Sequence, residues 1–417
     1  MVIFCSKVLK MRFVLTRIKT QMFRFEIIRQ STKSSARLGL IHTSHGTIKT
    51  PAFIFCATKA NIKGLPIDYV KGSGTQVILS NAYHLMLQPG SGLIKRGGGL
   101  HSFLSWDGPI FTDSGGFQIF SLGHGSVSSE IKGTRFGDRR RTLLRVTEEG
   151  AEFRSYIDGR LIKLTPELSM QIQMDLNADI IVSMDECTPY HISKLYTANS
   201  MEKSKRWAMR SLTEIKKHGR FEEQALLAVI QGGVYRDLRQ ESAQFANDND
   251  FPGFAIGGSL GKTKSEMYDV VAMTADMLDK QRYKHLLGIG GIEDIFEGVR
   301  SGIDTFDCVA PTRMARHGAA LVKRRELSNQ SQKIMNLNNS AYLEDFSPIS
   351  ESCRCYTCQT YSRAYIHHLL KAREVLAGGL ISIHNIFTMN RLMSDIRSAL
   401  ELDRLEEMRS DWGRTNT

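Results

Sequence analysis

The sequence predicts an α/β protein built on a (β/α)8 TIM barrel, and three observations support this fold class. Short apolar runs recur along the chain, each bounded by glycine or a charged residue, at residues 109–112, 178–184, 225–230, 254–256, 285–287 and 302–306. Runs this short and apolar indicate strands buried on both faces of a parallel sheet. Stretches with helical spacing alternate with them, as at residues 166–176, 200–215 and 265–278. Polar residues follow the strands at their carboxyl ends, where a barrel places its active site.

A doubly wound open sheet is the competing fold, since it also alternates strands with helices. That fold would carry a glycine-rich turn of the form G-x-G-x-x-G after its first strand. None of the glycine clusters in this chain has that form at that place. The barrel is therefore the preferred prediction.

The first 21 residues form a basic leader without any acidic residue; its basic residues are Lys7, Lys10, Arg12, Arg17 and Lys19. The leader lacks the continuous apolar segment of a secretory signal. It is interpreted as a weak organelle-targeting segment, a disordered basic arm, or an upstream extension with Met22 as the working start, and we favour the last. Alternation of apolar and polar residues begins at Phe23 and predicts a first strand over residues 23–29.

The chain of 417 residues carries 55 lysines and arginines against 43 acidic residues, a formal net charge of +12. From charge alone, a nucleic-acid partner and a generally basic protein are equally favoured. An arginine-rich segment at residues 135–145 has few apolar anchors, so we expect a mobile solvated loop rather than an ordered RNA site. No apolar stretch reaches the roughly 18 to 20 residues that span a bilayer. We therefore expect a soluble, cytoplasmic protein with no membrane attachment.

The cysteines Cys353, Cys355 and Cys358 form a C-x-C-x2-C cluster, whereas the other cysteines are scattered. Such a cluster brings three soft thiolates within reach of one tetrahedral Zn²⁺, which then needs a fourth nitrogen or sulfur ligand. His384 is the favoured fourth ligand. The rivals His367 and His368 lie in the middle of a predicted helix, where their side chains are expected to face solvent or RNA. Four protein ligands close the coordination sphere, so one zinc ion per chain would be structural; three reduced thiols without metal are the alternative.

Several motifs occur in a fixed order along the chain: Asp113-Ser114-Gly115-Gly116-Phe117-Gln118, Asp185-Glu186-Cys187, Gln231-Gly232-Gly233, Ala255-Ile256-Gly257-Gly258, and the segment 302–313 around Asp307. Together with the Cys/His cluster they resemble the tRNA-guanine transglycosylases, of the bacterial type, over about residues 23–393. An Asp-Ser-Gly-Gly alone is little more than a turn. The ordered series combined with the zinc-ligand spacing is highly specific.

The resemblance implies that the chain replaces a guanine at the tRNA wobble position with a 7-deazaguanine base, in queuosine modification. Exchange of one base for another with retained configuration calls for two successive displacements. Asp307 matches the family's nucleophile, which forms a covalent RNA ester. Asp113 matches the general acid/base that protonates the departing guanine and deprotonates the incoming base. The resemblance also suggests a homodimer.

The resemblance further implies how the base is recognised once it has left the anticodon stack. The carboxylate of Asp185 can accept hydrogen bonds from the ring N–H and the exocyclic amine of guanine. Gln231 and the backbone N–H of Gly258 can donate to its carbonyl oxygen. Adenine reverses these donors and acceptors and would leave buried groups unpaired. Phe117 and Leu287 match positions that sandwich the base, and the other substrate-binding residues of the first motif are Ser114, Gly115 and Gly116.

Two segments match RNA-contacting stretches of the family. The residues expected to contact RNA are Gly288, Ile289, Gly290, Gly291, Ile292, Glu293, Asp294, Thr312, Arg313, Met314, Ala315 and Arg316. Two arginines near the nucleophile suit the bases and phosphates of a single-stranded loop.

Any single aspartate at a strand end is more often a helix N-cap or a partner in a surface ion pair. The joint occurrence of Asp113, Asp185 and Asp307 favours function instead, because all three follow predicted barrel strands at the same end. The glycine pairs could be ordinary turns, but close approach of the backbone to a base is preferred, since glycine permits it.

The chain departs from the bacterial pattern at two places. Ser259-Leu260-Gly261 is one residue shorter than the usual loop lining the pocket for the 7-substituent, which could admit the bulky queuine. Phe117 replaces a frequent tyrosine. Because Cys187 resembles the bacterial form, 7-aminomethyl-7-deazaguanine is slightly favoured and queuine stays open.

The rival hypothesis is a non-catalytic RNA-binding subunit that pairs with a catalytic chain. Such a subunit need not keep Asp113 and Asp307 in intact motifs, so catalysis is favoured. An archaeal-type enzyme is a lesser alternative. Such enzymes usually carry a further C-terminal RNA-binding domain, and the residues after Met393 are too few for one. The predicted organisation is a basic extension (1–21), a barrel catalytic domain (22–345), and a zinc-binding subdomain with a C-terminal helix (346–417). An amphipathic helix is expected over residues 385–412.

Overall fold

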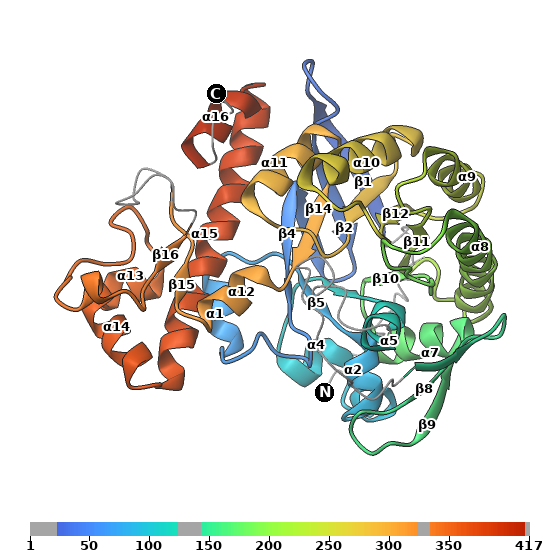
Figure 1. Cartoon of the computed structure of the whole chain (residues 1–417), viewed down its shortest axis with the longest axis horizontal. Coiled ribbons are helices and arrows are strands. Elements are labelled where there is room, and N and C mark those ends of the chain that lie inside the picture. Colours follow the sequence, from blue (N-terminus) through green and yellow to red (C-terminus); the bar gives the residue numbers. More distant parts are fainter. Residues whose placement is uncertain (1–22, 124–142, 324–333, 413–417) are drawn as a thin grey trace, which may run out of the picture.

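The computed structural model describes residues 23–123, 143–323 and 334–412, and a closed barrel of parallel strands lies at its centre (Figure 1). Around the barrel the strands follow the order β10 (Ile180–Val182), β11 (Ala225–Ile230), β12 (Gly253–Ile256), β13 (Tyr283–Leu286), β14 (Thr305–Cys308), β4 (Ala52–Cys56), β5 (Ile78–Ser80) and β6 (Ile110–Thr112). The predicted (β/α)8 fold class is confirmed. The basic leader lies outside the described residues, as do Arg135 and residues 139–141 of the predicted loop.

Successive side chains of the barrel strands pack on opposite faces. Leu79, Phe111 and Leu227 belong to a cluster inside the barrel. Their chain neighbours Ile78 and Ile110, like Leu226, pack outward against the helices. Both faces of these strands are therefore buried and apolar. Because successive side chains point to alternate faces, such strands appear in the sequence as continuous apolar runs.

Helices cover the outside of the barrel: α1 (Ile67–Gly72), α2 (Ala82–Leu87), α3 (Ser91–Arg96), α4 (Gly99–Leu104), α5 (Gly116–Gly123), α7 (Pro166–Leu176), α8 (Lys194–Lys217), α9 (Arg236–Asn247), α10 (Lys264–Met277), α11 (Ile292–Arg300) and α12 (Ala310–Ala315). The hydroxyls of Thr165, Ser193 and Thr263 cap the first turns of α7, α8 and α10. Each cap accepts a hydrogen bond from an otherwise unpaired backbone N–H and so fixes where the helix begins.

An antiparallel sheet, β1 (Arg24–Gln30), β2 (Arg37–Thr43) and β3 (Gly46–Thr50), precedes the barrel. The rings of Phe23 and Phe25 lie 6.4 and 6.1 Å from that of Tyr283. Phe23 belongs to the apolar cluster inside the barrel, so this sheet closes the amino-terminal end of the barrel. The predicted first strand is confirmed, displaced by one residue.

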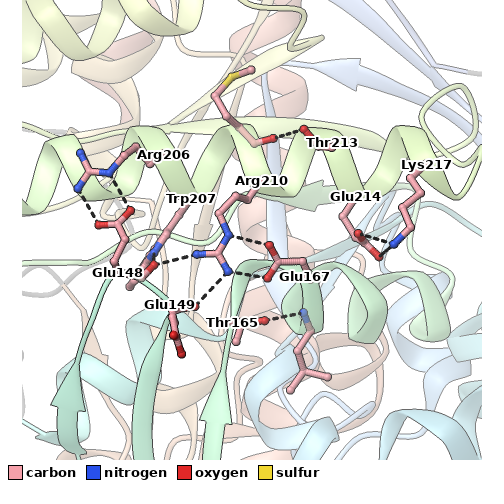
Figure 2. A network of polar contacts seen from close by, with 12 residues as sticks. Glu148, Glu149, Thr165, Glu167, Arg206, Trp207, Arg210, Thr213, Glu214 and Lys217 are labelled. Carbon is pink, nitrogen blue, oxygen red and sulfur yellow. Dashed lines mark hydrogen bonds and ion pairs between the residues drawn. The ribbon is translucent and has the colours of Figure 1, made fainter.

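A second antiparallel sheet, β7 (Leu143–Val146), β8 (Ala151–Arg154) and β9 (Leu161–Leu164), is inserted between β6 and α7. Figure 2 shows the polar network that fastens it to α7 and α8. Arg210 forms two 2.7 Å hydrogen bonds with the carboxylate of Glu167 and one of 2.8 Å with the Glu148 carbonyl. Arg206 holds the Glu148 carboxylate with two more. The loop predicted over residues 135–145 ends before residue 145, because Arg145 belongs to β7.

The C-terminal part contains β15 (Ala319–Ala320), β16 (Met335–Asn336), the 3-10 helix η2 (Ser340–Tyr342), α13 (Tyr356–Thr360), α14 (Arg363–Lys371), α15 (Val375–Glu401) and α16 (Leu405–Trp412). In Figure 1, β15, β16, α13 and α14 form a lobe beside the barrel, and the long helix α15 runs from this lobe along the barrel to α16. The expected apolar stripe of α15 is buried and packs with the barrel core. The boundary expected at residue 345 stays a prediction.

The single helix expected over residues 385–412 is wrong in its bounds. α15 begins at Val375, and the helical conformation is interrupted before α16 at Asp403, whose φ is +55°. The carboxylate of Asp403 accepts 2.5 Å hydrogen bonds from the hydroxyls of Ser31 and Thr32. This tertiary contact favours the break, which helical periodicity alone does not reveal. Among the helices that the structure describes, none is long and apolar enough to cross a membrane.

Candidate active site and metal centre

The predicted site residues converge on one end of the barrel. Because all barrel strands are parallel, their carboxyl ends meet at the same face, here called the mouth. Asp307 lies in β14, Asp113 directly follows β6, Gln231 directly follows β11, and Leu287 directly follows β13. Asp185 lies just after β10. The aspartates that are far apart in the sequence therefore face one space.

Asp113 is fixed by neutral donors. One oxygen accepts 2.9 Å from the backbone N–H of Ala82, and the other accepts from the side-chain amides of Asn81 and, at 2.7 Å, Gln118. Burial raises the pKa of Asp113, and the nearby charge of Asp307 adds to this effect, while the three donors oppose it. A carboxyl group with a raised pKa suits a residue that must give and take a proton.

Asp307 is held mainly through one of its two oxygens. Its Oδ1 accepts from the backbone N–H of Gly288 at 2.8 Å and from Nε2 of His285 at 3.1 Å. Its Oδ2 is approached by the thiol of Cys56 at 3.8 Å. Burial, followed by the charge of Asp307, raises the pKa of the Cys56 thiol, which therefore stays protonated. A thiol is a weak donor, so Oδ2 is the oxygen with the weaker hydrogen bonding.

The base-edge residues form a second group beside the two aspartates. The side-chain amide of Gln231 donates to Asp185 at 2.5 Å. Burial raises the pKa of Asp185 to about 7, assisted by the charges of Glu186 and Asp113. Gly258 has a φ of +76°, and a side chain there would collide with the Gln231 amide. A side chain at Gly116 would meet the Asp185 backbone oxygen, so these glycines permit the close packing of the site.

The remaining predicted base contacts lie around this group. Phe117 is 48% exposed at the start of α5, which leaves its ring available for stacking. Leu287 is half-buried and lies against Gly257. Ser114 is buried, and its hydroxyl accepts from the N–H of Gly116 at 3.3 Å. Gly115 has a φ of +83°, so the turn after Asp113 favours glycine.

The two predicted RNA segments differ in exposure. In the first, Gly288 and Gly291 are exposed and Gly290 is buried, with Ile289 and Ile292 half-buried. Glu293 and Asp294 engage other protein groups: Glu293 accepts from Arg409, and Asp294 accepts from Lys264 and the Tyr268 hydroxyl. This loop therefore contributes its backbone to the mouth, through the Gly288 N–H that holds Asp307.

The second segment extends from α12, directly after β14. Arg313 and Arg316 are exposed, while Thr312 and Ala315 are buried and Met314 is half-buried. Arg316 donates to the Thr312 carbonyl at 2.8 Å. The two guanidinium groups thus lie on the surface beside β14, the strand of Asp307, where a phosphate could approach them.

The cysteine cluster is assembled as predicted. Ligand atoms of Cys353, Cys355, Cys358 and His384 all lie within 4.8 Å of one another and could hold one metal ion. Nδ1 of His384 is 3.2 Å from the Cys358 sulfur and 3.7 Å from the Cys355 sulfur. Its Nε2 is 2.7 Å from the Leu321 carbonyl, a partner that directs the Nδ1 lone pair toward the sulfurs.

The structure decides between the histidines considered as fourth ligand. His367 is buried, with Nδ1 2.8 Å from the Leu337 carbonyl, so the expectation that it faces solvent or RNA is wrong. His368 is exposed on the same helix. Only His384 joins the cysteine cluster among the described residues.

Sequence reasoning missed several residues that shape the site. Asn81 and Gln118 hold Asp113, and His285 holds Asp307. Arg239 is fully buried and donates to the carbonyls of Ile230, Gly233, Gly257 and Ser259. It thereby joins the loops that follow β11 and β12, both of which carry base-edge residues. Burial lowers the pKa of Arg239 to about 10, which leaves it charged at neutral pH.

Comparisons with known proteins agree with this arrangement. The family model described as "Queuine tRNA-ribosyltransferase" matches residues 31–417. The chain is similar to queuine tRNA-ribosyltransferases of Thermoanaerobacter sp. (44% identity; 93% of this chain and 96% of the relative) and Roseiflexus sp. (44%; 93% and 98%). A relative of the same name from Protochlamydia amoebophila is also 44% identical, over 91% of this chain and 96% of its own length.

The chain belongs to the queuine tRNA-ribosyltransferase family. The family and the class of enzyme that the motifs predicted are thereby confirmed.

Proposed function

We propose that this enzyme exchanges guanine at the tRNA wobble position for a 7-deazaguanine base by double displacement through a covalent RNA ester. The observation that carries the proposal is the placement of Asp113 and Asp307 at one mouth beside the Asp185–Gln231 pair. A nucleophile, a proton carrier and a polar edge for a base are the groups that this exchange requires.

In the first displacement, Oδ2 of Asp307 attacks C1′ of the ribose. The C1′–N9 bond breaks, and its electron pair leaves with guanine, which takes a proton from Asp113. The raised pKa of Asp113 supports this role, because burial makes the carboxyl group hold a proton more readily than an exposed one does. In the second displacement the incoming base loses a proton to Asp113 and attacks C1′, and Asp307 leaves as a carboxylate.

Base selection rests on Asp185, Gln231 and Gly258. Ionised Asp185 accepts from the ring N–H and amine of guanine, and the Gln231 amide turns from Asp185 to the guanine carbonyl. A base with the opposite pattern leaves these buried groups unpaired, at a cost of about 1 to 3 kcal/mol for each. Phe117 and Leu287 contact the two faces of the base, which must leave the anticodon stack to enter.

The partner is a tRNA with guanine at the wobble position. The exposed guanidinium groups of Arg313 and Arg316 contact the anticodon loop, and Thr312, Met314 and Ala315 set the position of these arginines. The backbone of residues 288–294 borders the same loop. As in the family resemblance, the enzyme acts as a homodimer.

The incoming base is 7-aminomethyl-7-deazaguanine in preference to queuine. The cysteine at position 187 resembles the bacterial form of the family. Burial raises the pKa of its thiol to about 12, so it packs as a neutral group. The carbonyl of Ser259, in the short loop, accepts a hydrogen bond from Arg239. Queuine remains the competing substrate. Competitive incorporation of the two bases into unmodified tRNA measures the preference.

The Cys353, Cys355, Cys358 and His384 cluster binds one structural Zn²⁺. Three thiolates and one imidazole are a donor set that zinc prefers, and sulfur and nitrogen atoms 3.2 to 3.7 Å apart fit a tetrahedral ion. Four protein ligands leave no position for substrate. The ion would stabilise the C-terminal lobe, and these residues take no part in the base exchange.

The Asp307→Asn variant tests the proposal. The amide cannot form the ester, so guanine exchange should fall on the order of 10⁴-fold or more while tRNA binding is retained. Radiolabelled guanine exchange measures the rate, and a denaturing gel measures the RNA–protein adduct. Exchange at the wild-type rate would show that Asp307 is not the nucleophile. Absence of exchange by the wild-type chain alone would favour the rival role of a non-catalytic RNA-binding subunit.

A further inference from the structure

A chain of four side chains inside the barrel ends at the nucleophile. The hydroxyl of Tyr283 hydrogen bonds to that of Thr305, the Thr305 oxygen lies 2.8 Å from Nδ1 of His285, and Nε2 of His285 lies 3.1 Å from Oδ1 of Asp307. Tyr283 and His285 belong to β13, and Thr305 and Asp307 to the adjacent β14. His285 and Thr305 are register partners, so strand pairing itself brings them together.

This chain is shielded from water everywhere except at its final member. Tyr283, His285 and Thr305 have no exposed surface, and Asp307 is 8% exposed at the mouth. The ring of Phe111 packs against His285, with centroids 4.7 Å apart. In such surroundings a misplaced proton cannot be compensated by solvent, so the hydrogen bonds must be mutually consistent.

Only one direction of donation satisfies every member. Burial raises the pKa of Tyr283, so its phenol stays protonated and can donate to Thr305. The Thr305 hydroxyl then has its own proton free for Nδ1 of His285, which leaves the ring proton on Nε2, facing Asp307. The reverse direction would point an unprotonated Nε2 at a carboxylate, which is electrostatically unfavourable.

We propose that His285 is a positioning residue that selects the attacking oxygen of Asp307, an inference that rests on the nucleophilic role proposed above. Together with the Gly288 N–H, it directs two donors to Oδ1. Oδ2 is left with the Cys56 thiol at 3.8 Å. The plane of the carboxylate is fixed, and the oxygen with the weaker contact faces the substrate.

The same donors act in both displacements. When the C1′–Oδ2 bond forms, Oδ1 becomes the carbonyl oxygen of the ester and keeps its hydrogen bonds to His285 and Gly288. When the incoming base breaks that bond, the negative charge returns to the carboxylate, and both donors stabilise it. Loss of the His285 donor should therefore slow the chemical steps and leave the binding of tRNA unchanged.

The test compares His285→Leu, which removes the donor, with His285→Gln, whose amide can donate from near the position of Nε2. A hydrogen bond to a charged group corresponds to about a 10- to 100-fold effect, so kcat of His285→Leu should fall by that factor. KM for tRNA should stay within about twofold, and His285→Gln should recover most of kcat. Single-turnover formation and decay of the RNA adduct should slow in the same order.

Thr305→Val and Thr305→Ser provide a second comparison that leaves His285 in place. The valine variant removes the hydroxyl that fixes the imidazole proton, so kcat should fall, and the serine variant should recover it. This pair decides the question if His285→Leu fails to fold, which circular dichroism and thermal unfolding will reveal.

Equal losses in His285→Leu and His285→Gln, or unchanged kcat in every variant, would overturn the positioning role. So would a rise in KM for tRNA with unchanged kcat. These results are distinguishable from failure of the proposed function, because Asp307→Asn abolishes adduct formation if only the role of His285 is wrong and leaves exchange intact if Asp307 is not the nucleophile.

Discussion

The two ends of the barrel bury the same residue type and shift its pKa in opposite directions. At the amino-terminal end, Asp179 is buried, yet hydrogen bonds from His101, His45 and the Ile110 N–H bring its pKa down to about 2. At the mouth, burial raises the pKa of Asp185 to about 7, and it also raises that of Asp113. The difference lies in the partners, since the mouth supplies mainly neutral donors.

The amino-terminal end also contains a fully compensated ion pair. Arg37 and Asp304 are both buried, and Nε and Nη2 of the guanidinium donate to the two carboxylate oxygens at 2.8 and 2.6 Å. The backbone N–H of Lys284 donates to Asp304 as well. This end therefore gives its buried carboxylates charged partners, whereas the mouth surrounds Asp113 and Asp185 with neutral donors, and burial raises the pKa of both.

The largest effect should come from exchanging aspartate for asparagine at each end. Asp113→Asn removes the proposed proton carrier, so kcat should fall about 10²- to 10⁴-fold, with the urea midpoint close to wild type. Asp179→Asn should lower the urea midpoint and leave kcat close to wild type, because its partners lose a charged acceptor. Guanine exchange and urea unfolding of both variants measure this. A stability loss in Asp113→Asn equal to that in Asp179→Asn would remove the distinction between the two ends.

Breaking the buried ion pair should have the next largest effect. Arg37→Met leaves Asp304 buried without its cation, which should lower the free energy of unfolding by about 3 to 5 kcal/mol. Arg24→Met is the matched control, since Arg24 is 59% exposed and its pair with Glu26 should contribute at most about 1 kcal/mol. Similar urea unfolding curves for the two variants would contradict the importance assigned to the buried pair.

Guanine binding should depend on pH through Asp185. In the proposed complex the base donates two hydrogens to this carboxylate, so it should bind best to the ionised form, and the pKa of about 7 places the transition at neutral pH. Affinity should therefore fall about tenfold between pH 8 and pH 6. Equilibrium binding of labelled guanine measures the change. Asp185→Asn should bind weakly with a flat profile over this range, and a wild-type profile that is equally flat would contradict the assignment.

The contrast between the ends also explains how much the sequence could predict. Asp113, Asp185, Asp307 and the cysteine cluster were found because each follows an apolar run or has fixed ligand spacing, both of which are local patterns. His285 was assigned only to an apolar run, since nothing local shows that its ring faces a carboxylate on the next strand. Asp179 is the second residue of another such run, and its histidine partners come from distant segments.

Arg239 is the residue that a closer reading of local pattern could have found. It lies on one stripe of α9 with Ser242, Ala243 and Ala246, which are all buried. Positions i, i+3, i+4 and i+7 share a helix face, so an arginine there is predicted to face the core. The acceptors of its five donors could not be predicted, because they are backbone carbonyls whose positions depend on the closed barrel.

The smallest effect concerns the protonation of His45. Its hydrogen bond to Asp179, 2.7 Å long, raises the pKa of this histidine against the opposing effect of burial. The groups facing it are Asp179 and the ring of His101, stacked at 3.5 Å. Because the folded-state pKa is raised, the protonated form stabilises the fold fully below the ordinary histidine pKa of about 6.5, and this stability is lost as the pH rises through the folded-state value. Urea midpoints from pH 5.5 to 8.5 should therefore fall more steeply for the wild type than for His45→Gln, whereas parallel profiles would show that Asp179 holds His45 equally well when it is neutral.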